Sequence, residues 1–171
     1  MPSLSVPSPL GTLTLFSETL DVGGASGDEA LVAVDWGRGA EANGSPFLNE
    51  VARQLDEYFD GRREVFDLPL APRGTSFQQA VWRQLLAIPY AVTRTYGDLA
   101  NILGSAARAV GQACGRNPIP VIIPCHRVIG AGRRLVGFSA DGGVDTKRRL
   151  LVLEGAVLPL DDPATDDDAT E

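Results

Sequence analysis

The chain has 171 residues, 44% of them hydrophobic, and a formal net charge of −7. This is enough material for the core of one large domain or two small ones. Its apolar runs are far shorter than the roughly 20 residues of a membrane helix, and its N-terminus lacks the basic start and apolar stretch of a secretory signal. We expect a globular cytoplasmic protein with no membrane partner.

The two cysteines, Cys114 and Cys125, are separated by ten residues. A single pair in one region cannot organise a fold through disulfides, so we expect free thiols. Together with the single histidine, His126, they offer at most three metal ligands at an unhelpful spacing. Neither a metal nor a cofactor is expected.

Charge is unevenly distributed along the chain. Residues 1–90 sum to −6, residues 91–150 to +6 and residues 151–171 to −7. A basic segment between two acidic ones is typical of a surface that binds an anionic polymer such as nucleic acid. A solvated basic face explains the same counts, so charge alone leaves both interpretations open.

The first 72 residues predict a small domain of strands and one helix. Alternation at Leu13 and Leu15 and the apolar run 31–34 predict two short paired strands. Ser45 caps a helix that has Pro46 in its first turn. Its apolar positions at helical spacing are Leu48, Val51, Leu55 and Tyr58. Alternation in residues 66–70 predicts an edge strand, and residues 71–74 read as a linker.

From residue 73 to residue 160 the pattern is mainly helical. An apolar stripe on residues 77–88 predicts one helix, and Thr95 with Asp98 resembles the capping box of a second helix that stops at Gly104. Ser105 is expected to cap a third helix. These two short helices around a tight turn form a helix-turn-helix, although an ordinary helical hairpin gives the same pattern.

The end of the chain combines an extended approach, a final helix and an acidic tail. The prolines near residues 118–120 and the β-branched run 121–123 predict a stiff extended stretch that ends at Cys125. The last helix is expected at 145–154, with Glu154 on the same face as Leu150 and Leu151, so its carboxylate needs a buried partner. Residues 161–171 are too acidic and apolar-poor to fold, and are expected to be disordered.

Cys125 and His126 are adjacent, and a thiol beside an imidazole can form an activated nucleophile. In an extended segment consecutive side chains point to opposite faces, so His126 reaches the thiol only through a bend or a water molecule. A structural cysteine beside a structural histidine explains the adjacency equally well.

The run Ile123-Pro124-Cys125-His126-Arg127-Val128-Ile129-Gly130 resembles the acceptor motif of the O6-alkylguanine-DNA alkyltransferases, the methylated-DNA protein-cysteine methyltransferases. The resemblance extends over about 80 residues and includes the segments 95–100, 107–111, 116–118 and 147–155. It implies an α+β chain with a small RNase-H-like N-terminal α/β domain. A mainly helical, winged-helix-like DNA-binding and acceptor domain follows.

The resemblance also implies a chemical role for five residues. Cys125 accepts the alkyl group from guanine O6 in an irreversible, single-turnover displacement. His126 acts as its base through a water molecule, and Glu154 orients the imidazole. Asn117 resembles the family's hinge residue, and Tyr96 donates toward guanine N3. An unperturbed thiol is mostly protonated at neutral pH, so such activation is required.

Double-stranded DNA that carries O6-alkylguanine is the implied partner of a monomeric protein, and O4-alkylthymine is left open as a second substrate. The damaged base has to leave the helix stack to reach the thiol. Arg108 resembles the arginine that fills the gap, on a helix that enters the minor groove. Ser139, Phe138 and the carbonyl of Val128 are implied at the guanine, and Arg127 is counted among the substrate and DNA contacts.

Two features depart from the family pattern. Phe138 stands where many members have Tyr, and segment 138–143 is longer than in some of them. Three other classes remain in competition: a binding-only relative, a winged-helix regulator and a thiol hydrolase. The first lacks an acceptor cysteine, and neither of the others explains the complete set of matching residues.

Overall fold

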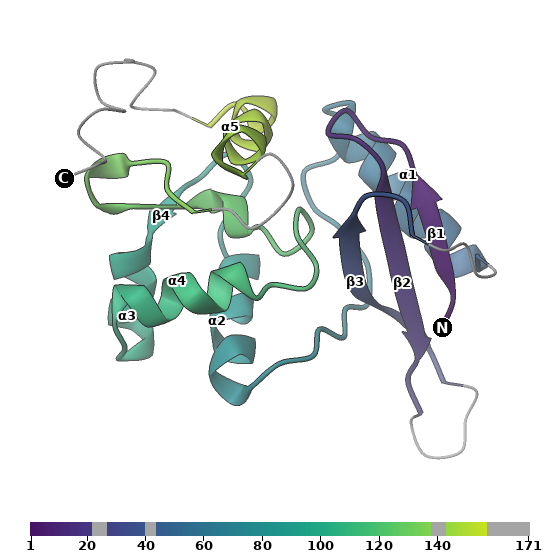
Figure 1. Cartoon of the computed structure of the whole chain (residues 1–171), viewed down its shortest axis with the longest axis horizontal. Helices are drawn as coiled ribbons and strands as arrows, with labels where there is room; N and C mark the ends of the chain where they lie inside the picture. Colours follow the sequence, from purple (N-terminus) through teal and green to yellow (C-terminus); the bar gives the residue numbers. More distant parts are fainter. Residues whose placement is uncertain (22–26, 40–43, 138–142, 157–171) are drawn as a thin grey trace. The chain divides into compact units, whose positions relative to one another are not determined.

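The computed structural model describes residues 1–21, 27–39, 44–137 and 143–156. These residues form two compact units (Figure 1). Unit 1 comprises Met1–Thr75 and Pro118–Ile122, and unit 2 comprises Ser76–Asn117 and the chain from Ile123 onward. The domain limits inferred from the sequence stay predictions, and the expected tail at 161–171 lies outside the described residues. No described helix has the length and apolar composition to cross a membrane.

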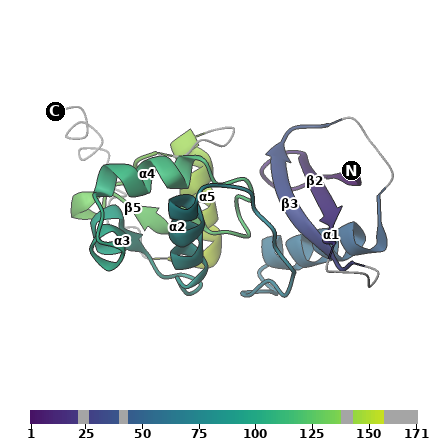
Figure 2. The same ribbon diagram turned by 90° about the horizontal axis from the view of Figure 1, so that it is seen from below.

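Unit 1 is a three-stranded antiparallel sheet with one face covered by helix α1 (Figures 1 and 2). The strands are β1 (Ser3–Val6), β2 (Leu13–Thr19) and β3 (Glu29–Trp36), in the order β1-β2-β3. The predicted pairing of β2 with β3 is confirmed, and β1 is an additional strand. Because Leu13 and Leu15 point toward α1 and are completely buried, the sheet and the helix share one core.

Helix α1 (Pro46–Phe59) begins where the sequence predicts it. The Ser45 hydroxyl accepts a hydrogen bond from the Leu48 backbone N–H at 3.1 Å, and Pro46 occupies the first turn. Its buried residues include all four of the predicted apolar positions: Leu48, Val51, Leu55 and Tyr58. The helical spacing of apolar residues therefore identified the face that packs on the sheet.

The edge strand predicted at residues 66–70 is wrong. Leu70 forms only an isolated bridge with Leu31, whose N–H donates to the Pro69 carbonyl and whose carbonyl accepts from the Ala71 N–H. Proline has no N–H to continue a ladder, so Pro69 limits the pairing to this single bridge.

Unit 2 contains four helices among its described residues: α2 (Ser76–Leu86), α3 (Tyr96–Leu103), α4 (Ala107–Gly115) and α5 (Gly143–Glu154). Two short 3-10 helices, η1 (Cys125–Arg127) and η2 (Ala131–Arg133), lie between α4 and α5 along the chain. Strand β4 (Arg94–Thr95) pairs in parallel with β5 (Val128–Ile129). This pairing holds the start of α3 beside the segment that follows η1.

The helix-turn-helix is made by α3 and α4. The capping box of Thr95 and Asp98 is confirmed, and Gly104 ends α3 with a left-handed backbone (φ 62°). The predicted cap at Ser105 is wrong, because Ala106 is the N-cap of α4 and provides no side-chain bond. The Ser105 N–H instead donates to Ala100 O, so Ser105 belongs to the end of α3.

Candidate active site

The acceptor segment is a bend rather than the extended stretch that the sequence predicted. Val121 has a left-handed backbone (φ 73°), and residues 120–122 form a turn. Cys125 and His126 then lie in η1, where the Arg127 N–H donates to the Pro124 carbonyl at 3.0 Å. A 3-10 helix rotates successive side chains by about 120° rather than by the 180° of a strand. The bend that His126 was expected to need is therefore present.

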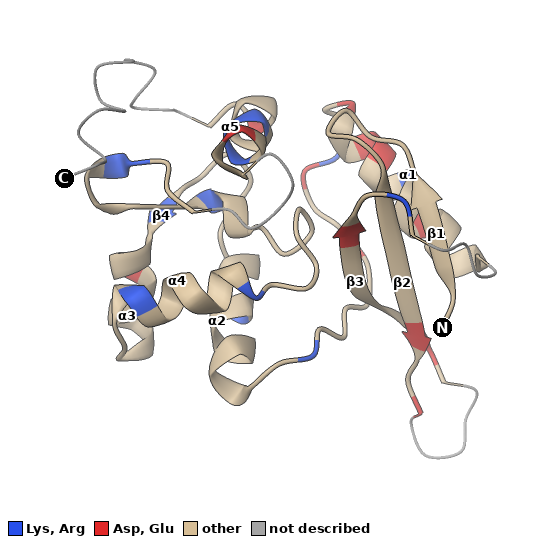
Figure 3. Ribbon diagram, viewed as in Figure 1, with Lys and Arg blue, Asp and Glu red and all other residues tan. Residues whose placement is uncertain are grey.

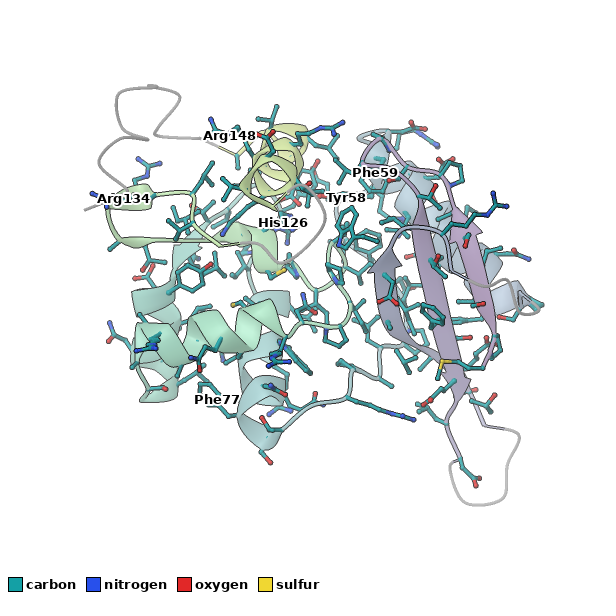
Figure 4. All side chains as sticks on the ribbon, in the orientation of Figure 1. Tyr58, Phe59, Phe77, His126, Arg134 and Arg148 are labelled. Atoms are coloured by element: carbon teal, nitrogen blue, oxygen red, sulfur yellow. The ribbon has the colours of Figure 1, made fainter. Side chains whose placement is uncertain are left out.

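His126 and Glu154 form a buried pair. His126 Nε2 lies 2.6 Å from Glu154 Oε2, and both side chains are fully buried. A carboxylate only accepts hydrogen bonds, so Nε2 carries the proton in the neutral imidazole. Nδ1 is buried and has no hydrogen-bond partner among the described residues. In Figure 4 His126 lies against α5, the helix that carries Glu154.

Burial is the main influence on the protonation of His126, and it lowers the pKa of the imidazole. The bond to Glu154 and its negative charge raise this pKa, whereas the charges of Arg127 and Lys147 lower it further. The balance favours a neutral imidazole with a free lone pair on Nδ1. Such a group can accept a proton.

Arg127 does not face an open surface, as its expected contact with substrate or DNA would require. Its side chain is 8% exposed, and Nε and Nη2 donate to Glu154 Oε1 and Oε2 at 2.9 and 3.0 Å. Nη1 donates to the Ile88 carbonyl at 2.7 Å. The buried guanidinium of Arg127 therefore contacts the same carboxylate that contacts His126.

The thiol of Cys125 is buried, and burial raises its pKa. Three kinds of group oppose this effect and favour the thiolate: a hydrogen bond from the Asn117 side chain, the charge of Lys147, and the backbone N–H groups of Cys125 and His126. Asn117 Nδ2 also donates to the Ile123 carbonyl at 2.8 Å. Asn117 therefore holds both the backbone before the cysteine and the sulfur itself.

Lys147 belongs to this site, although it was not among the residues predicted from the sequence. It is completely buried, and Nζ donates to Val136 O, Gly137 O and Tyr96 Oη at 2.8, 3.2 and 3.3 Å. Burial lowers the pKa of its ammonium to about 8. The sequence could have indicated its burial, because Lys147 stands three and four residues before Leu150 and Leu151, on the buried face of α5.

Tyr96 and Val128 are brought into the same neighbourhood by the β4–β5 pair. Tyr96 directly follows β4, is half-buried, and donates through its hydroxyl to the Val136 carbonyl at 3.2 Å. Burial raises the pKa of this phenol, which keeps it a hydrogen-bond donor. Val128 is buried in β5 opposite Arg94. The predicted residues Phe138 and Ser139 lie outside the described residues.

Arg108 stands apart from this buried cluster, on the exposed side of α4 near its N-terminus. Unit 2 has other exposed cations as well, whereas the acidic side chains gather mainly in unit 1 (Figure 3). They include Arg83, Arg94, Arg116, Arg133, Arg134 and Arg149. The positive charge of this part of the sequence is therefore exposed on several elements of unit 2, among them the helix-turn-helix.

Two domain profiles match the chain: the ribonuclease-like domain of 6-O-methylguanine DNA methyltransferase over residues 5–72, and its DNA-binding domain over residues 76–156. The methylated-DNA–protein-cysteine methyltransferase of Methanosarcina acetivorans is 43% identical over 159 residues, which cover 87% of this chain and 95% of that protein. The chain belongs to the 6-O-methylguanine DNA methyltransferase family. The resemblance inferred from the acceptor motif is confirmed.

Solved structures of this methyltransferase family agree with the fold. The crystal structure of Mycobacterium tuberculosis OGT in complex with DNA has a TM-score of 0.74 and 42% identity, and covers 90% of this chain and 92% of that chain. The M. tuberculosis O6-methylguanine methyltransferase structure has the same TM-score at 41% identity, with 94% and 96% covered. The predicted fold class, a ribonuclease-like domain followed by a helical DNA-binding domain, is confirmed.

Proposed function

We propose that this methyltransferase repairs DNA by moving a methyl or other alkyl group from O6-alkylguanine to the sulfur of Cys125. The observation that carries the proposal is the placement of Cys125 in a buried turn whose neighbours supply a base, an oriented carboxylate and a buried cation. These neighbours are His126, Glu154 and Lys147. Membership of the 6-O-methylguanine DNA methyltransferase family supports the same reaction.

The transfer is a displacement at saturated carbon. The Cys125 sulfur donates an electron pair to the alkyl carbon, the bond between that carbon and O6 breaks, and its electrons remain on the guanine. The thiol proton passes to His126 Nδ1 through a water molecule, and the Tyr96 hydroxyl donates to guanine N3 as the base becomes negative. The product thioether has no easy route back to a thiol, so each chain reacts once.

Asn117 and the pocket residues position the reacting groups. Asn117 supports the sulfur through the hydrogen bond that favours the thiolate, and fixes the backbone at Ile123. We assign the guanine edge to Ser139 and to the carbonyl of Val128, with Phe138 as a wall of the pocket. Arg127 is assigned to the site's interior instead of to the DNA, because its guanidinium is bonded to Glu154.

Access to the buried thiol requires the damaged nucleotide to rotate out of the duplex, at a cost of a few kcal/mol. Helix α4 enters the minor groove, and Arg108 fills the space that the base leaves. Exposed arginines that adjoin the helix-turn-helix, Arg94 and Arg116, contact phosphates, which gives affinity with little sequence preference. The protein acts as a monomer, in the cytoplasm, where a free thiol persists.

Intact mass spectrometry of the protein after incubation with DNA containing O6-methylguanine tests this function. One added methyl group per chain, located on Cys125, is expected, with repair that stops at one lesion per protein molecule. An unchanged mass with retained DNA binding would indicate a binding-only protein. Repair of excess DNA by a small amount of protein would indicate turnover and overturn the proposal.

A further inference from the structure

The carboxylate of Glu154 is held by at least four donors, and two of them come from Arg127. Oε1 accepts from Arg127 Nε at 2.9 Å and from the Ala91 N–H at 3.2 Å. Oε2 accepts from His126 Nε2 at 2.6 Å and from Arg127 Nη2 at 3.0 Å. A two-pronged arginine contact fixes both oxygens in one plane, which a single bond cannot do.

Arg127 is itself fixed from outside the pair. Nη1 donates to the Ile88 carbonyl, just beyond α2, and the guanidinium carbon lies 5.7 Å from the centre of the Tyr90 ring. The Tyr90 hydroxyl donates to Leu153 O at 3.5 Å, next to Glu154. Arg127 therefore connects the acceptor turn both to the loop after α2 and to α5, and its guanidinium has little freedom to move.

The charges around His126 explain what this arrangement does. Glu154 from α5 is negative, Arg127 from η1 and Lys147 from α5 are positive, and Cys125 is a thiol or thiolate. A buried carboxylate with only an imidazole as partner draws a proton onto that imidazole, because an isolated buried charge is costly. Arg127 neutralises Glu154 directly, so this demand on His126 is removed.

We propose that Arg127 is a positioning residue that clamps Glu154 and thereby keeps His126 neutral, with its proton on Nε2 and its lone pair on Nδ1. The proposal rests on the proposed role of Cys125 as acceptor, because the free Nδ1 is what receives the thiol proton. A protonated imidazole carries hydrogens on both nitrogens and cannot accept another. The clamp therefore decides whether a base is present in the resting protein.

His126 is the one histidine of the sequence, so NMR of ¹⁵N-labelled imidazole reports on it alone. Four variants separate charge from geometry. Arg127→Met removes the positive charge and the two-pronged contact. Arg127→Lys keeps the charge but cannot form the two-pronged contact. Arg127→Met combined with Glu154→Gln removes the whole ion pair. Arg83→Met, at an exposed arginine on α2, is the matched control for loss of one cation.

In the unaltered protein we expect a neutral imidazole with Nε2 protonated near neutral pH, because burial lowers the pKa of His126. In Arg127→Met the pH of half-protonation should rise by at least about one unit, the scale expected when one neighbouring charge is removed. The double variant should return to a neutral imidazole, since the carboxylate that draws the proton is also gone. Arg127→Lys should mix the two neutral tautomers and slow single-turnover transfer about tenfold.

A protonated His126 in the unaltered protein near neutral pH would overturn the clamp, and that measurement needs no variant. The clamp would also be overturned if the protonation state and tautomer of His126 in Arg127→Met and in Arg127→Lys were the same as in Arg83→Met. Failure of the unaltered protein to take up a methyl group, with the expected NMR behaviour, would instead refute the proposed function and leave the clamp standing. The two ideas can therefore fail separately.

Discussion

His126 Nε2 and Glu154 Oε2 are 2.6 Å apart, and neither side chain is exposed. The carboxylate fixes which imidazole nitrogen carries the proton and stabilises the imidazolium that forms when the thiol is deprotonated. Glu154→Gln keeps the shape of this contact and removes its charge. We expect slower transfer in this variant, with Cys125 reacting only at higher pH.

His126→Ala should show a comparable loss, and the double variant should lose little more than either single one, because the two residues act as a unit. Single-turnover transfer measured against pH in all three proteins checks this. Glu154→Gln also leaves Arg127 with a buried, uncompensated charge, so unfolding should become easier by about 3 kcal/mol or more. Independent, additive rate losses would return Glu154 to a purely structural role.

The same helix shows how far the sequence alone could lead. Apolar Leu150 and Leu151 define the buried face of α5, and this face predicted that the carboxylate of Glu154 needs a partner inside the protein. Lys147 lies on the same face and is completely buried, so the same spacing could have selected it as well. The caps at Ser45 and Thr95 were likewise readable, because capping depends on neighbours three residues away.

Residue spacing alone could not provide contacts between distant segments, and the family resemblance that implied the pairing of His126 with Glu154 assigned no part in it to Arg127. Arg127 follows the acceptor residues in a motif that resembles a DNA-repair family, but its partner, Glu154, lies 27 residues further along the chain. The turn at Val121 also contradicts the preference of a β-branched residue for extended backbone. Both features depend on tertiary packing, which neither residue spacing nor intrinsic conformational preference reports.

The two cysteines are expected to behave differently as acceptors. Both are buried and free, and burial raises the pKa of Cys114 to about 12, so its thiol stays protonated at neutral pH. Cys125→Ala should abolish methyl uptake while binding to alkylated DNA persists, whereas Cys114→Ala should still gain one methyl group. Intact mass and gel-shift measurements on both variants check this. Loss of uptake in Cys114→Ala would move the acceptor assignment.

Arg108 is exposed near the start of α4, away from the buried cluster. If it fills the gap left by the extruded base, Arg108→Ala should slow repair of duplex DNA by tenfold or more, an order of magnitude that corresponds to about 1.4 kcal/mol. Transfer from the free base O6-benzylguanine, which needs no extrusion, should change little. Equal losses on the two substrates would show that Arg108 supports the pocket and not extrusion.

Lys147 should make the thiol of Cys125 more acidic, because its positive charge favours the thiolate. Lys147→Met keeps the length of the side chain and removes the charge. At about pH 7 we expect iodoacetamide to react several times more slowly with Cys125 in this variant. Since the pKa of Lys147 is about 8, its charge fades above that pH, and the difference between the proteins should shrink there.

This comparison is best made in a Cys114→Ala background, where Cys125 is the one remaining thiol. Arg149→Met, which removes an exposed cation from the same helix, is the control and should leave the reaction unchanged. Identical pH profiles for Lys147→Met and its parent would mean that the ammonium only supports the carbonyls of Val136 and Gly137 and the hydroxyl of Tyr96.

Burial of His126 should make folding stability depend on pH. Its pKa in the folded protein lies below the ordinary 6.5, whereas in the unfolded chain the imidazole takes up a proton near pH 6.5. Between these two values the unfolded state binds more protons, so the free energy of unfolding falls as the pH drops below about 6.5. Urea unfolding at about pH 7.5, 6.5 and 5.5, compared with His126→Gln, isolates this effect. The unaltered protein should lose more stability than His126→Gln between pH 6.5 and 5.5, because only the unaltered protein has an imidazole that takes up a proton when the chain unfolds. Parallel curves for the two proteins would show that His126 does not have the lowered pKa.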